Sequence, residues 1–202
     1  MNILDELNLI PNKTVINHII SNHPFDLDLS QKLNSIKINL SEIDGIAKEM
    51  IKFDSTNTYI ELGVGRNTHL KENFKYILYH EFGHAADRLN ANFKYSENEK
   101  SKLNDKEKMG VMEIWNIYID ARLNENDLFY LGYQPITIGT LNGKVTRFPD
   151  GIEGKLLSHI SMLESCGMEY IAAKELTDSI WNIPSRTLSY MDMISYIKQD
   201  NG

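Results

Sequence analysis

The residues of this chain whose types and spacing could do chemistry run from His80 to His84 and read H-E-F-G-H. Positions four apart on a helix differ by about 400° of rotation, so the two imidazoles would project from one face, about one turn apart. Two neutral histidines in that arrangement can share one tetrahedral Zn²⁺ ion. The carboxylate of Glu81 could reach a water molecule on the same ion and act as general base. This pentad, His80–His84, therefore predicts one Zn²⁺ per chain with Glu81 as the catalytic residue.

A catalytic zinc site needs a third protein ligand and leaves the fourth position to water. Residues 85–93 contain no further histidine, and the single later one, His159, lies far along the chain. A later helical stretch places Glu113, Asn116 and Asp120 on one face. A carboxylate is costly to bury in apolar surroundings unless a cation pairs with it, and Asp120 has the more apolar neighbours. We therefore predict Asp120 as the third ligand, with Glu113 or Asn116 as an alternative ligand or a supporting residue.

The neighbours of Asp120 leave two interpretations open. Asp120 could be a surface carboxylate that pairs with Arg122 or Asn124. Alternatively, Trp115 and the residues after it resemble the W-N-x-x-x-D-x-x-x-N pattern that follows H-E-x-x-H in metallopeptidase-like domains found with von Willebrand-type domains. In that group the aspartate stands as the third zinc ligand, and the resemblance implies the same role for Asp120.

Together with the pentad, this pattern makes residues 55–125 similar to the zincin superfamily of metallopeptidases. The resemblance implies an α+β, zincin-like fold, in which a small and mostly antiparallel sheet packs on an active-site helix and a helical C-terminal part follows. It also implies hydrolysis of peptide bonds by zinc-activated water. Gluzincins take a glutamate ligand that has an acidic residue four positions further on. Glu113 has Ile117 at that place, so Glu113 is the second choice as a ligand.

The sequence indicates two further parts of a peptidase site less clearly: the group that stabilises the oxyanion and the strand that binds the substrate. The group that stabilises the oxyanion could be Tyr118, Tyr130, Tyr133 or His159, although each also suits a packing role. In zincins the strand before the active-site helix binds substrate in extended form. Residues 58–64 could therefore pair with a peptide by strand addition, or could form an ordinary strand of the sheet.

Hydrophobic periodicity and turn residues predict the elements that must position these side chains. Residues 35–65 indicate two or three strands around a turn at 54–57, with a helix as the alternative for 43–52. Asn142-Gly143 between two alternating runs is typical of a two-residue hairpin. The predicted strands are 35–40, 46–53, 58–64, 136–141 and 144–148. The predicted helices are 69–89 (capped by Asn67 or Thr68), 106–124, 152–165, 168–181 and 188–198, with a loop at 90–104.

These elements suggest two parts of the chain. We predict a zincin-like domain at residues 1–130, which contains one or two N-terminal helices, the strands near 35–65, the active-site helix and the helix of the third ligand. Residues 131–202 would form a hairpin and helical subdomain that completes the cleft.

The charge and composition of the chain limit the kinds of partner that the protein could bind. The net charge of -7 argues against a protein that follows nucleic-acid phosphates, which needs clustered Lys and Arg. No segment approaches the roughly 18 uninterrupted apolar residues of a membrane span, and residues 1–13 lack an apolar stretch of signal-peptide length. The single Cys166 suits a reducing compartment. We expect a soluble, cytoplasmic protein that acts on a peptide or protein substrate, without nucleic-acid or membrane partners.

Three functions fit these residues. The first is a single-zinc metallopeptidase of the H-E-x-x-H type. The second is a zincin-like regulatory or scaffold protein, similar to the ImmA/IrrE regulators, that binds or cleaves one specific partner and has no general protease activity. The third is a metal-free helical protein in which the pentad occurs by chance.

Overall fold

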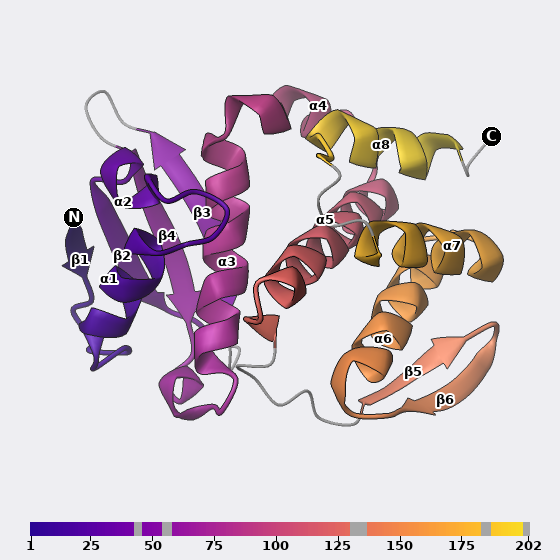
Figure 1. The fold of residues 1–202 in the computed structure, drawn as a ribbon, viewed down its shortest axis with the longest axis horizontal. Helices are drawn as coiled ribbons and strands as arrows, with labels where there is room; N and C mark the ends of the chain where they lie inside the picture. Colours follow the sequence, from indigo (N-terminus) through magenta and orange to yellow (C-terminus); the bar gives the residue numbers. More distant parts are fainter. Residues whose placement is uncertain (43–45, 54–57, 130–136, 183–186, 200–202) are drawn as a thin grey trace. The chain divides into compact units, whose positions relative to one another are not determined.

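The computed structural model describes residues 1–42, 46–53, 58–129, 137–182 and 187–199 (Figure 1). Contacts within the chain group it into two compact units. The N-terminal unit contains residues 1–90 and 126–132, and the C-terminal unit contains residues 91–125 and 133–202.

The N-terminal unit contains a four-stranded sheet in the order β1-β2-β4-β3. Its strands are β1 Asn2–Leu4, β2 Ser35–Leu40, β3 Ile46–Phe53 and β4 Thr58–Val64. β1 with β2 and β2 with β4 pair parallel, whereas only β3 with β4 pairs antiparallel. The expectation of a mostly antiparallel sheet is therefore wrong. Because β3 reverses direction before β4, β4 returns in the direction of β2 and pairs with it as a parallel neighbour.

The three strands predicted between residues 35 and 65 are confirmed, and the helical alternative for 43–52 is wrong where the structure describes it. β3 pairs with β4 from Ile46 opposite Val64 to Phe53 opposite Thr58. This long-range pairing outweighs the local helical preference of residues 47–50. β4 has a partner strand on both sides, so strand addition of a peptide to β4 is also excluded.

Alternation along β2 and β4 decides which face of the sheet is covered. One face of each strand is buried, whereas the residues between are half-buried or exposed. On that second face the ammonium of Lys37 lies 4.1 Å from the ring centre of Tyr59. The buried face contains Ile36, Ile38, Ile60, Leu62 and Val64.

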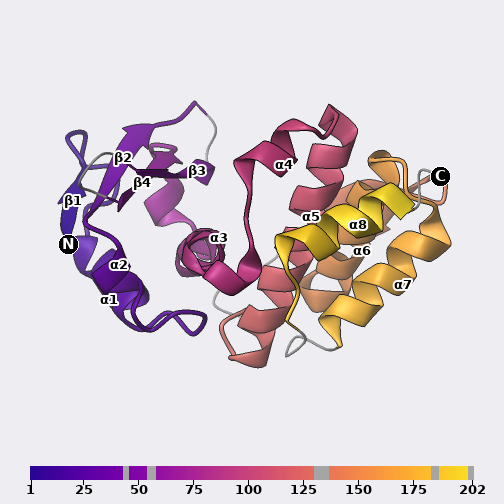
Figure 2. The ribbon, with the colours of Figure 1, turned by 90° about the horizontal axis from the view of Figure 1, so that it is seen from above.

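Helices cover that buried face. α1 contacts α3, and both lie on the same side of the sheet (Figure 2). The helical segments of this unit are α1 Lys13–Ser21, α2 Leu29–Lys32, η1 Thr68–Leu70 and α3 Phe74–Leu89. α3 begins later than expected, after Asn73, because the backbone is extended at Lys71 and ends the short η1 segment there.

The C-terminal unit is mainly helical. α5 contacts α6, α7 and α8, and α6 contacts the hairpin. The helix of Asp120, expected in the N-terminal domain, is grouped by these contacts with the C-terminal elements. The elements are η2 Ala91–Phe93, α4 Glu97–Ser101, α5 Asp105–Glu125, β5 Thr137–Leu141, β6 Lys144–Phe148, α6 Gly151–Ser165, α7 Tyr170–Trp181 and α8 Tyr190–Gln199.

The predicted hairpin and helices of this unit are confirmed within one or two residues. Asn142 and Gly143 both have positive φ, 48° and 72°, as a two-residue hairpin turn of this kind requires. The segment 90–104, expected to be a loop, contains the two short helices η2 and α4, and the Ser96 hydroxyl caps the second by accepting from the Glu99 backbone N–H. None of the described helices has the length and apolar character needed to cross a membrane. The fold is thus α+β.

Candidate metal centre

The pentad lies in the middle of α3, and its two histidines are neighbours. The ring centres of His80 and His84 are 5.0 Å apart, and the ring planes meet at 73°. His84 is buried, whereas His80 and Glu81 are half-buried. α3 therefore presents two imidazoles one turn apart, as the spacing predicted, and Glu81 follows His80 on the same helix.

The opposite face of α3 holds the pentad against the sheet. Leu78, Phe82 and Ala85 are fully buried. On the side of the histidines, the ring of Tyr76 lies tilted beside that of His80, with ring centres 5.9 Å apart, and it also meets Phe129 edge-on at 5.5 Å. Burial of one face and aromatic packing beside His80 fix the rotation of α3 and hence the direction of the pentad.

His23 anchors the loop after α1 to the same helix. Its ring is fully buried, Nε2 lies 2.9 Å from the carbonyl oxygen of Tyr79, and Nδ1 accepts from the backbone N–H of Phe25 at 3.3 Å. A ring that accepts at Nδ1 and donates at Nε2 is a neutral imidazole. His23 therefore has a structural role. It holds the loop after α1 to the backbone of Tyr79, the residue that precedes the pentad.

Asp120 lies on α5 and is fully buried. Its Oδ2 atom is 3.2 Å from Nε2 of His159 and 3.4 Å from Nζ of Lys155. The interpretation of Asp120 as a surface carboxylate is therefore wrong. Arg122 lies over Tyr118, with its guanidinium carbon 3.9 Å from the ring centre, and donates to the Tyr118 carbonyl oxygen at 3.4 Å.

Glu113 and Asn116, two turns and one turn before Asp120, belong to the same group. Oε1 of Glu113 is 2.6 Å from Nδ1 of His159, and Nδ2 of Asn116 donates to Oε2 of Glu113 at 3.1 Å. Burial alone would raise the pKa of Glu113, but the hydrogen bond and charge of His159, the Asn116 amide and the charge of Lys155 together lower it. The Glu113 carboxylate is therefore held in its ionised form.

His159 thus lies between two carboxylates. We call Glu113, Asn116, Asp120, Lys155 and His159 the α5–α6 polar cluster. Carboxylate oxygens only accept hydrogen bonds, so both contacts of the His159 ring are made together only when both nitrogens carry a proton. Lys155 was not singled out in the sequence, although its place four residues before His159 on α6 is the signal that could have indicated it.

The predicted site residues therefore fall into two sets. The pentad belongs to the N-terminal unit and the α5–α6 polar cluster to the C-terminal unit. Within the described ranges, no group of three or more His, Cys, Asp and Glu side chains forms a metal-binding arrangement. Of the candidates for the oxyanion group, Tyr118 is buried and His159 contacts the two carboxylates, whereas Tyr130 and Tyr133 lie outside the described residues.

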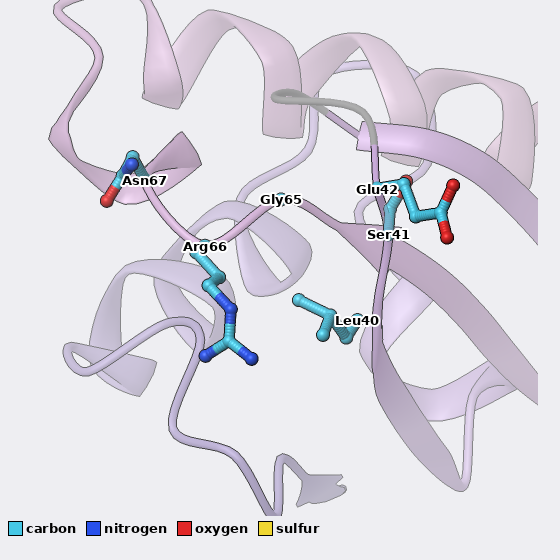
Figure 3. Close-up of a pocket in the computed structure, with 6 residues that line it drawn as sticks. All are labelled: Leu40, Ser41, Glu42, Gly65, Arg66 and Asn67. Atoms are coloured by element: carbon cyan, nitrogen blue, oxygen red, sulfur yellow. The ribbon is translucent and has the colours of Figure 1, made fainter.

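The N-terminal unit also contains a cavity of about 420 Å³ at the carboxyl ends of the parallel strands β2 and β4 (Figure 3). The guanidinium of Arg66 extends toward Leu40 in this view, whereas the carboxylate of Glu42 lies on the far side. None of the pentad residues lines this cavity. Its lining consists of Leu40, Ser41, Glu42, Gly65, Arg66 and Asn67.

The donors present fit zinc in type. His80 and His84 offer two nitrogens one turn apart, and Asp120 is a carboxylate in a fully buried position. Two imidazoles and one carboxylate are a known catalytic zinc set that keeps a position open for water. Comparison of the chain with protein-family models, with curated protein sequences and with solved structures gave no match.

Proposed function

We propose that this protein is a zinc-dependent metallopeptidase, zincin-like in type, that hydrolyses peptide bonds. The proposal rests on one observation above all: the imidazoles of His80 and His84 are neighbours on one face of α3, with ring centres 5.0 Å apart, and Glu81, the next residue after His80, is half-buried. A helix that presents two imidazoles and a carboxylate in this order has the parts for hydrolysis by metal-bound water.

Each residue has a proposed role. His80, His84 and Asp120 hold the ion, His80 and His84 as the pair on α3 and Asp120 from α5. Zn²⁺, when bound, lowers the pKa of a water molecule and polarises the substrate carbonyl. Glu81 accepts the proton that the attacking water loses and donates it to the leaving amine. Because Glu81 is not a ligand, its removal should abolish hydrolysis while leaving the ion bound.

The test compares Glu81→Gln with the unaltered protein. We expect one Zn²⁺ per chain in both by metal analysis, and a loss of peptide cleavage of at least about 100-fold in the variant, because general-base catalysis contributes about 10²–10⁴-fold. Glu72→Gln is the matched control, since Glu72 is exposed and precedes the same helix. Cleavage assays should use a broad mixture of unfolded proteins and peptides, analysed by mass spectrometry.

Two outcomes would count against the proposal. Equal cleavage by the unaltered protein and Glu81→Gln would refute the mechanism, and a protein that takes up no zinc would refute the site. Zinc uptake without cleavage of any peptide in the mixture would instead favour a regulator with one specific partner.

A further inference from the structure

The α5–α6 polar cluster joins two helices through matched charges. On α6, Lys155 and His159 are four residues apart and so point from one face, and on α5, Glu113 and Asp120 are seven residues apart and share a face as well. His159 reaches both carboxylates, and Lys155 reaches only Asp120. Where α5 and α6 pack together, the acidic side chains of Glu113 and Asp120 therefore lie opposite the basic side chains of Lys155 and His159.

The burial of its charged side chains makes the α5–α6 polar cluster unusual as a packing contact between two helices. The side chains of Asp120 and His159 are 0% and 2% exposed, and that of Glu113 is 13% exposed. Charges in such surroundings are costly unless each is paired and hydrogen-bonded, and apolar residues of similar size would fill the same space without that cost. A buried cluster of this kind on the face that carries the proposed ligand suggests a role in the site.

His159 is held at two points, which limits its movement. Nδ1 contacts Glu113 at 2.6 Å and Nε2 contacts Asp120 at 3.2 Å, so rotation of the ring would break at least one contact. Glu113 is itself oriented by the Asn116 amide at 3.1 Å. The chain of contacts from Asn116 through Glu113 and His159 therefore ends on Oδ2 of Asp120 and sets the orientation of that carboxylate.

We propose that His159 is a positioning residue for the metal centre, which holds the Asp120 carboxylate in the orientation needed to bind Zn²⁺, while Glu113 orients the His159 ring. The inference rests on the proposed function. Residues that hydrogen-bond to metal ligands reduce metal affinity by about 10- to 100-fold when they are removed, because the ligand loses its fixed orientation. His159 acts through Asp120 and does not touch the substrate.

The test measures metal affinity directly. Zn²⁺ dissociation constants are determined by competition with a chromophoric chelator for the unaltered protein, His159→Leu, His159→Gln and Glu113→Gln. We expect a loss of affinity of about 10- to 100-fold for His159→Leu and a smaller loss for Glu113→Gln. His159→Gln keeps one donor toward Asp120 and should recover part of the affinity. His18→Gln, at an exposed histidine of α1, is the matched control.

A second readout separates positioning from simple stabilisation. Co²⁺ absorption in the visible range reports the geometry of the ligands, so His159→Leu should change the band shape, and metal-free unfolding should be measured in parallel. A variant with lower metal-free stability but unchanged Zn²⁺ affinity and Co²⁺ spectrum would overturn the inference and leave the proposed function intact. Should His159→Leu not fold, Glu113→Gln and His159→Gln carry the same comparison. An unaltered protein that binds no Zn²⁺ would overturn both proposals.

Discussion

Glu113 shows how the surroundings of a single residue decide its chemistry. Its carboxylate is largely buried, which by itself favours the neutral acid, yet it accepts hydrogen bonds from His159 and Asn116. The hydrogen bonds and charges outweigh burial and lower the pKa of Glu113.

At low pH the free energy of unfolding of the metal-free protein should fall, partly because Glu113 becomes protonated. A carboxyl group whose pKa is lowered by folding contributes stability that is present above its ordinary value of 4.5 and is lost as the pH falls through the lower folded value. In the unaltered protein the free energy of unfolding should therefore fall below pH 4.5, and Glu113→Gln should make this dependence shallower. Urea denaturation between pH 3 and 7 measures both. Glu175→Gln, at an exposed site, should leave the pH dependence unchanged, and equal slopes for Glu113→Gln and the unaltered protein would contradict the assignment.

At the scale of the elements, α3 and α6 differ in how the chain enters the first turn of the helix. α3 begins at Phe74 rather than near residue 69, because the extended backbone at Lys71 separates it from η1. α6 begins directly after the hairpin, and the chain at Pro149 folds back against the first turn of the helix. Helix starts of this kind depend on backbone contacts that hydrophobic periodicity does not encode.

Gly154 on α6 should not tolerate a side chain. Helix propensity alone predicts that Gly154→Ala stabilises a helix by about 1 kcal/mol. A Cβ atom at Gly154 would lie 1.7 Å from the backbone carbonyl oxygen of Pro149, a group that cannot rotate away. We expect a net loss of about 2–3 kcal/mol in the free energy of unfolding, measured by urea denaturation. Glu153→Ala, at the exposed neighbouring position, should change it by less than about 0.5 kcal/mol, and a stabilising Gly154→Ala would contradict the packing described.

At the scale of the whole molecule, tryptophan fluorescence can follow the unit that contains Asp120. Trp115 and Trp181, the two tryptophans of the chain, belong to the C-terminal unit, so tryptophan fluorescence reports the unfolding of that unit. Zn²⁺ at 100 times its dissociation constant stabilises a folded protein by about 2.7 kcal/mol. With Asp120 as a ligand, this stabilisation should appear in the fluorescence transition of the unaltered protein.

Asp120→Asn should reduce that shift strongly, because an amide is a much weaker zinc ligand than a carboxylate. Urea titrations with Zn²⁺ and with a chelator measure the shift in each protein, and His18→Gln should behave as the unaltered protein does. An equally large Zn²⁺ effect in Asp120→Asn would show that Asp120 is not a ligand and would leave His80 and His84 to be explained by another third donor.

Local patterns predicted much of the secondary structure. Alternation of apolar residues gave the three strands between 35 and 65, and Asn142-Gly143 gave the hairpin, because side-chain direction and turn geometry depend on a few neighbouring residues. The placement of His80 and His84 on one helix face follows from a spacing of four residues in the same way. The chain by itself therefore determined most of the elements and the placement of the two histidines of the pentad.

Only the tertiary structure decided how these elements combine. β4 lies between β2 and β3 and pairs parallel with β2, so two of the three strand pairings in this sheet are parallel. In the same way, only the structure shows that α5 groups with the C-terminal helices. The same is true of His159, which is 46 residues from Glu113 in the chain and 2.6 Å from it in space. Pairings of this kind depend on which distant surfaces exclude water together and which buried charges find partners, and neither is encoded in the spacing of neighbouring residues.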